Sequence, residues 1–316
     1  MTPVIRALKS KYHNAEITLL VGSAATAELF RYNDAVSGTI VYDKRGAHKS
    51  FMSFIRLWKQ LRATKFDLVI NFQRSNFRTW LLASAAFPCR ILVYHKARDR
   101  TVHAVVNYLE TIAPLGISST DLELELSPGP EAKAFAGNLL SAFKASNRPL
   151  IALNPGASHP IKQWGTDQFA ALADILSKDL SANIIIVGGL DDIPLSEEIA
   201  QHTSSRPLLL AGKLDLLQLG AVLEQCDILV SGDTGPMHVA TAVGTRVAGL
   251  FGSTDPARTG PVGRGHRVIQ AKGVPCVPCR SLICQTAMYR ECMNKLLPET
   301  VFDVIRSMLY ERKTVR

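Results

Sequence analysis

The sequence predicts an α/β protein made of two doubly wound domains that face a cleft, and three observations carry this prediction. Short apolar strands alternate with amphipathic helices along the chain of 316 residues, as in parallel sheets that helices cover on both faces. A chain of this length usually divides into two domains. Several predicted strands end in glycine-rich turns, where such sheets bind ligands.

The first predicted domain spans residues 1–148. Its strands are expected at 17–21, 39–42, 68–72 and 90–93, and its helices at 2–11, 24–31, 48–64, 78–86, 100–115 and 131–145. Residues 146–149, SNRP, predict the domain boundary because Ser, Asn and Pro favour loops.

The second predicted domain spans residues 149–298, and a helix within 299–316 closes the chain. Strands are expected at 150–154, 182–187, 208–210, 228–231, 247–251 and 267–270, and helices at 166–180, 194–201, 216–224 and 236–243. The strands are almost continuously apolar, which favours burial on both faces.

The positive charge is concentrated in the first half of the chain. Residues 1–149 contain 20 Lys and Arg and 11 Asp and Glu, whereas residues 150–316 contain 16 of each. This asymmetry predicts an anionic partner for the first half, with an ordinary basic surface as the alternative. With no run of eighteen apolar residues and no apolar leader at the start, the sequence predicts a cytoplasmic protein that touches a membrane surface at most peripherally.

The most informative segment is residues 230–240, VSGDTGPMHVA, which joins a predicted strand to a helix. Its two glycines allow a sharp turn and a close approach to a ligand. Asp233 and Thr234 are good N-caps, and the helix they begin presents free amides and the positive end of its dipole. The segment therefore predicts an anion site.

A second loop, residues 154–164 (NPGASHPIKQW), follows the first strand of the second domain. Ser158 offers a hydroxyl and Lys162 a charge for phosphate, with an ordinary surface lysine as the alternative. Trp164 is expected to pack the loop against the next helix.

Two further strand ends carry weaker signals. Residues 187–192, VGGLDD, place Asp191 where a carboxylate commonly holds a ribose. Residues 251–256, FGSTDP, form another glycine-containing turn. His238 lies one helical turn beyond Thr234, on the side that faces the predicted anion.

Four cysteines follow the spacing C-x2-C-x4-C-x7-C, which in a reducing compartment predicts a structural zinc site. Reduced or redox-labile thiols are the alternative. The four are Cys276, Cys279, Cys284 and Cys292.

The sequence lacks the motifs of several other classes of protein. No G-x-G-x-x-G follows a first strand, which argues against a dinucleotide oxidoreductase, and no G-x-x-x-x-G-K-[ST] is present. No nucleic-acid-binding motif accompanies the basic half, so no nucleic acid is expected as a partner.

The segments 231–238, 251–256 and 154–164 together resemble the ADP-heptose:lipopolysaccharide heptosyltransferase family, glycosyltransferase family 9. Residues 67–73, DLVINFQ, resemble a strand of its acceptor domain. The resemblance covers nearly the whole chain. It implies a GT-B fold of two Rossmann-like domains, with the donor bound by the second, the acceptor by the first, and the final helix crossing back to the first.

The reaction implied by this resemblance is transfer of a heptose from ADP-heptose to the inner core of lipopolysaccharide, with inversion and without a cofactor. Lys162 and His238 would stabilise the leaving group. The implied donor-binding residues are Ser158, Lys162, Asp191, Leu214, Asp233, Thr234, Gly235 and His238. A transferase for another nucleotide sugar and a non-catalytic paralogue that binds a nucleotide sugar or glycolipid are the alternatives.

The acceptor implied by the resemblance is an anionic lipopolysaccharide precursor at the inner face of the inner membrane. Basic residues expected near strand ends of the first domain are candidates to contact it. They are Arg74, Arg78, Lys96, Arg98 and Arg100.

The sequence departs from the family at its start. Members open with a strand and a Gly-Asp loop whose aspartate is the general base. Residues 1–9, MTPVIRALK, match the helix after that loop. The first strand and the base are therefore expected upstream of Met1, the alternatives being an inactive product or another base.

Overall fold

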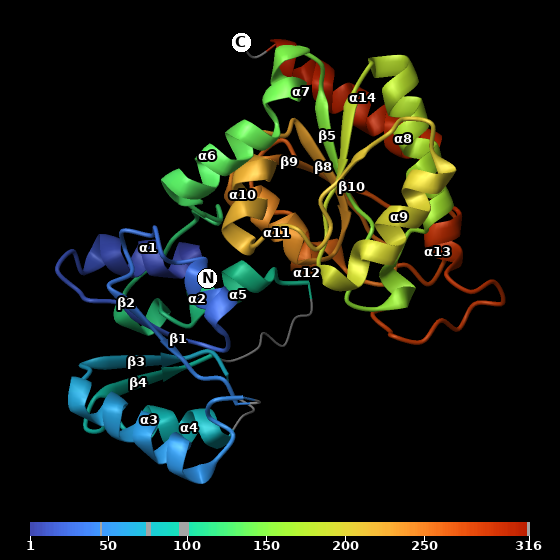
Figure 1. Cartoon of the computed structure of the whole chain (residues 1–316). Helices are drawn as coiled ribbons and strands as arrows, with labels where there is room; N and C mark the ends of the chain where they lie inside the picture. Colours follow the sequence, from blue (N-terminus) through green and yellow to red (C-terminus); the bar gives the residue numbers. More distant parts are fainter. Residues whose placement is uncertain (45, 74–76, 95–100, 315–316) are drawn as a thin grey trace. The chain divides into compact units, whose positions relative to one another are not determined.

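The computed structural model describes residues 1–316 except 45, 74–76, 95–100 and 315–316 (Figure 1). The chain divides into two compact units, Met1–Leu122 and Glu123–Arg316. Every strand pair described in either unit is parallel. The predicted α/β class with parallel sheets is therefore confirmed.

The first unit contains two pairs of strands. β1 (Thr18–Val21) runs beside β2 (Gly38–Val41), and β3 (Leu68–Asn71) runs beside β4 (Arg90–Val93). Among the described residues these pairs form two separate two-stranded sheets.

Two helices of the first unit, α3 (Phe51–Thr64) and α4 (Phe77–Ser84), pack against each other. α3 begins where the Ser50 hydroxyl accepts a hydrogen bond from the Ser53 amide. Leu57 of α3 and Leu82 of α4 are buried in one apolar cluster, which explains why the two helices stay together. The other helices are α1 (Thr2–Lys11), α2 (Ala24–Glu28), α5 (Ala104–Glu110) and the 3₁₀ turn η1 (Ala113–Leu115).

The second unit is built on a six-stranded parallel sheet in the order β10-β9-β8-β5-β6-β7. Counted from β5, this is the doubly wound order 3-2-1-4-5-6, whose direction reverses between β5 and β8. Every residue of β5 and β8 is buried. The strands are β5 (Leu150–Asn154), β6 (Asn183–Ile186), β7 (Leu208–Leu209), β8 (Ile228–Gly232), β9 (Arg246–Leu250) and β10 (Arg267–Ile269).

Helices cover both faces of this sheet (Figure 1). α8 (Thr166–Leu180) packs with α9 (Ile193–His202) and α14 (Pro298–Thr314) on one face, and α10 (Leu216–Glu224) packs with α11 (Gly235–Ala242) on the other. The shorter helices are α7 (Ser141–Ala145), α12 (Pro256–Thr259), α13 (Glu291–Asn294) and the 3₁₀ turns η2 (Pro160–Lys162) and η3 (Leu190–Asp192).

The second unit begins at Glu123, ahead of the boundary near residue 148 that the sequence suggested. Helix α6 (Gly129–Leu139) packs on α10, and Lys133 of α6 forms a 2.9 Å ion pair with Glu224. The turn-rich residues before α6 are held too, since the Leu126 amide donates to a backbone carbonyl of α11. Side-chain packing, which loop composition does not reveal, assigns these residues to the second unit.

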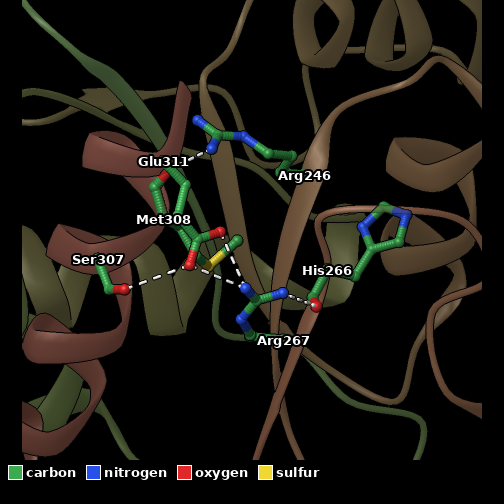
Figure 2. Close-up of polar contacts among 6 residues, drawn as sticks. All are labelled: Arg246, His266, Arg267, Ser307, Met308 and Glu311. Atoms are coloured by element: carbon green, nitrogen blue, oxygen red, sulfur yellow. Dashed lines mark hydrogen bonds and ion pairs between the residues drawn. The ribbon is translucent and has the colours of Figure 1, made fainter. Parts of the chain in front are cut away.

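The C-terminal helix α14 is held on the second unit. Its side chains Val301 and Met308 are fully buried in the same core as α8. Arg267 donates two hydrogen bonds of 2.9 Å to Glu311, and Arg246 donates a hydrogen bond to the backbone carbonyl of Met308 (Figure 2). That α14 also crosses back to the first unit stays a prediction.

His266, labelled in Figure 2, gives the second unit a pH-dependent contact. Its Nδ1 accepts a 3.1 Å hydrogen bond from the Val247 amide. Burial lowers the pKa of His266, against the opposing effects of the Val262 backbone and Glu123. The pKa of His266 in the folded protein lies below its unfolded value of about 6.5. The stabilisation that neutral His266 contributes is therefore fully present above about pH 6.5 and is lost as the pH falls.

We therefore expect the unfolding free energy of the wild type to fall more steeply below about pH 6.5 than that of His266→Asn, which keeps an acceptor but does not titrate. One proton limits the difference in slope to about 1.4 kcal/mol per pH unit. Urea unfolding at several pH values measures it. Identical slopes would contradict the prediction.

Candidate functional site

The candidate site lies at the carboxyl ends of β5 and β8, the two central strands of the second unit. Their register pairs Asn154 with Ser231, so the loops that follow them start side by side. β9 pairs with β8 on its other side, which brings the 251–256 turn to the same edge. The three motifs thus meet at the reversal point of the sheet, where doubly wound proteins bind ligands.

Asn154 fixes the two central loops to each other. It is buried, and its Nδ2 donates 3.0 Å hydrogen bonds to the hydroxyls of Ser231 and Thr234. Its Oδ1 is buried and has no hydrogen-bond partner among the residues that the structure describes. The sequence places Asn154 at the start of a predicted ligand loop but indicates no role for it, and its one signal is a polar amide at the end of an otherwise apolar strand.

Lys162 and Asp233 form an ion pair between the same two loops. Lys162 Nζ lies 3.3 Å from Asp233 Oδ2, and the two side chains are only 17% and 11% exposed. This partial burial makes the pair stronger than an ordinary surface contact. Lys162 is therefore no ordinary surface lysine.

The turn after β8 presents the start of helix α11. Thr234 is the N-cap residue, but its side chain makes no capping bond because its hydroxyl contacts Asn154 and Ser231 instead. The Thr234 hydroxyl therefore does not cap the first amides of α11, and these amides can donate to a ligand. Gly235 is exposed with open space where a Cβ would stand, and His238 lies half-buried one turn further on.

The remaining predicted donor residues surround this centre at neighbouring strand ends. Ser158 is exposed in the loop after β5, Asp191 is exposed in η3 after β6, and Leu214 is half-buried after β7. The η3 turn is capped by Asp192 rather than Asp191: Asp192 Oδ2 accepts a 2.8 Å hydrogen bond from the Gly189 amide. The ligand contacts assigned to these residues stay predictions.

Residues between β10 and α13 form hydrogen bonds to the loops of the site, and the sequence did not indicate these contacts. Arg290 Nη1 donates to the carbonyls of Pro160 and Gln163, which flank Lys162, at 3.2 and 3.1 Å. The Arg280 amide donates 2.7 Å to the Ser253 carbonyl. No local pattern marks these arginines, because their partners lie far away in the sequence.

The four clustered cysteines do not form the expected zinc site. In the part of the chain that the structure describes, no group of three or more His, Cys, Asp or Glu side chains is placed to hold a metal ion. Cys276 and Cys279 are exposed, whereas Cys292 is buried in the core. Cys284 Sγ instead accepts a 3.3 Å hydrogen bond from the Arg290 amide.

The thiols differ in acidity accordingly. The hydrogen bond between Cys284 and the Thr286 hydroxyl is the main cause that lowers the pKa of Cys284, whereas burial raises the pKa of Cys292 and of Cys226. The zinc prediction came from spacing alone, which does not fix where each sulfur points.

Of the predicted acceptor residues, the structure describes one. Arg78 is exposed in the first turn of α4. The others lie outside the described residues: Arg74, Lys96, Arg98 and Arg100.

A reversal-point site with a helix N-terminus and a half-buried lysine is typical of α/β proteins that bind phosphorylated ligands. Comparison with known proteins narrows this class. The model of glycosyltransferase family 9 (heptosyltransferase) matches residues 54–290, and the chain belongs to this family.

Its similarity to individual members extends over almost the whole chain. It is 28% identical to lipooligosaccharide heptosyltransferase 2 of Campylobacter jejuni over 313 residues, covering 97% of this chain and 94% of the relative. The solved structure of a glycosyl transferase family 9 protein from Veillonella parvula matches with a TM-score of 0.84 and 23% identity, covering 98% of this chain and 93% of that one.

The solved structure of E. coli ADP-heptose lps heptosyltransferase II matches with a TM-score of 0.78 and 22% identity, and the match covers 98% of this chain and 94% of that one. These likenesses confirm the GT-B fold. None of the helices in the described ranges has the length and apolar character needed to cross a membrane.

Proposed function

We propose that this chain transfers a heptose from ADP-heptose to the core of a lipopolysaccharide precursor, with inversion at the anomeric carbon. The Lys162–Asp233 pair at the start of α11 is the observation that carries the proposal. The family and the activity named for the E. coli and Campylobacter proteins support the choice of sugar.

The site suits the departure of ADP. As the bond between the sugar and the β-phosphate breaks, negative charge grows on that phosphate. The amides of Thr234 and Gly235, the dipole of α11 and the Lys162 ammonium group are oriented donors for this charge. Asp233 holds the ammonium group in place before the donor arrives.

The other donor-binding roles follow the order of the strand ends. Asp191 would hold the ribose, the backbone of Leu214 would contact the adenine, and Ser158 and His238 would complete the phosphate site. No metal ion or other cofactor takes part in these steps.

The acceptor is an anionic core precursor on the cytoplasmic face of the inner membrane. The net positive charge of residues 1–149 supports this assignment. Arg78, Arg74, Lys96, Arg98 and Arg100 are the proposed contacts.

The proposal is tested with the full chain, ADP-heptose and a heptose-deficient core acceptor. We expect calorimetric binding of ADP-heptose, transfer of a single heptose, and an inverted anomeric configuration by NMR. Binding without transfer would favour a non-catalytic paralogue or a chain that lacks its general base. Turnover only with GDP- or UDP-sugars would favour another donor, and absence of any nucleotide-sugar binding would overturn the proposal.

A further inference from the structure

Helices α3 and α4 of the first unit expose large apolar side chains in their first turns. Phe51 of α3 and Phe77 of α4 are each 75% exposed. Met52 follows Phe51, and Trp80 and Leu81 follow Phe77 at the helical spacing i, i+3, i+4, so they share its face. Large apolar side chains exposed at the starts of two helices that pack together indicate an interaction surface.

The two helices that carry these side chains are packed firmly against each other. Leu57 of α3 and Leu82 of α4 are buried in their common core. Trp58 Nε1 lies 3.4 Å from Ser84 Oγ, and Arg62 donates 3.3 Å to the carbonyl of Ala85. The sides on which the two helices pack are therefore buried and hydrogen-bonded, whereas the apolar side chains of their first turns are exposed.

The same part of the sequence holds the positive charge of the first half. Residues 44–98 contain twelve Lys and Arg side chains and a single acidic one, Asp67. On α3, exposed Arg56 and Lys59 follow Met52 at i+4 and i+7, on the same face. Long basic side chains beside exposed aromatic ones are typical of surfaces that lie in a membrane interface.

We propose that the apolar first turns of α3 and α4, together with the exposed Arg56 and Lys59 of α3, dock on an anionic lipid bilayer. Phe51, Met52, Phe77 and Leu81 would enter the headgroup boundary, while Arg56 and Lys59 contact lipid phosphates. Met52 and Leu81 offer no ring on which a base could stack, whereas a lipid headgroup boundary accepts all four side chains, which favours the bilayer over single-stranded nucleic acid. The choice of a bilayer rests on the proposed function, because its acceptor is a lipid.

Vesicle co-sedimentation tests the proposal with the full chain and no donor. We expect binding to vesicles of mixed phosphatidylglycerol and phosphatidylcholine, weakened by salt, and at least about tenfold weaker binding to pure phosphatidylcholine. Phe51→Ser/Phe77→Ser and, separately, Arg56→Glu/Lys59→Glu should each weaken binding at least about tenfold. Ile283→Ser, which changes a side chain 74% exposed in the second unit, is the matched control and should have no effect.

Unchanged melting temperature and ADP affinity in the variants would show that the fold and donor site are intact. Equal binding to both vesicle types, unchanged binding by the double variants, or equal loss in the control would overturn the proposal. Tight binding to RNA or DNA with no vesicle binding would also overturn it. Vesicle binding without heptose transfer would leave this surface standing and contradict only the proposed function.

Discussion

Lys162→Ala is expected to lower kcat by about 10²–10³-fold, which corresponds to about 2.7–4 kcal/mol of transition-state stabilisation. The half-buried ammonium group, 3.3 Å from Asp233, is a fixed charge beside the start of α11, where the departing diphosphate is proposed to lie. Its contribution should grow as the phosphate gains charge, so kcat should fall more than the affinity for ADP-heptose. Steady-state kinetics and calorimetry measure the two quantities separately.

Lys295→Ala is a matched control, because Lys295 forms another lysine–carboxylate pair in the same unit, 2.6 Å from Glu291. It should leave kcat within about threefold of the wild type. Asp233→Asn tests whether the carboxylate only holds Lys162; if so, it should cost less than Lys162→Ala. A Lys162→Ala protein with nearly normal kcat would show that the charge does not serve the leaving group.

Trp164→Ala is expected to lower the free energy of unfolding by about 3–5 kcal/mol. Trp164 is 2% exposed, its ring meets Phe169 edge-on with centroids 4.9 Å apart, and its Nε1 donates 2.8 Å to the Leu296 carbonyl. Alanine would leave a cavity and an unsatisfied buried carbonyl. Because Trp164 ends the loop that carries Lys162, donor affinity should weaken as well.

Urea unfolding of the wild type, Trp164→Ala and Trp164→Phe measures this effect. Phenylalanine keeps an aromatic contact with Phe169 but loses the indole hydrogen bond, so its cost should be smaller. A loss below about 1 kcal/mol for Trp164→Ala would mean that the loop does not depend on this anchor.

Features that depend on neighbours along the chain could be predicted from the sequence. The turn at 231–235 joins β8 to α11, and Thr234 stands at the N-cap, because N-capping and glycine turns involve only adjacent residues. The helix that the sequence predicts at 236–243 lies at Gly235–Ala242. The packing role of Trp164 is confirmed for the same reason, since its ring contact, Phe169, is in the next helix.

Contacts between distant segments could not be predicted in this way. Asn154 and Thr234 are separated by 80 positions, and Arg290 and Pro160 by 130. Nothing in the residues near Arg290 shows that its guanidinium group reaches the loop that carries Lys162. The same holds for the four cysteines. Their spacing predicts a zinc site, but in the fold Cys276 and Cys279 are exposed and Cys292 is buried, and the described residues contain no group placed to hold a metal ion.

The amino-acid sequence alone therefore determined the alternation of strands and helices, the glycine-containing turns at the strand ends, and the chemical groups available there. The tertiary structure decided which of these groups meet, because the strand order places β5 beside β8 and so brings Lys162 to Asp233. It also decided that residues 123–148 pack with the second unit. The physical reason is that backbone preferences act over a few residues, whereas burial and sheet pairing join residues that the chain itself keeps far apart.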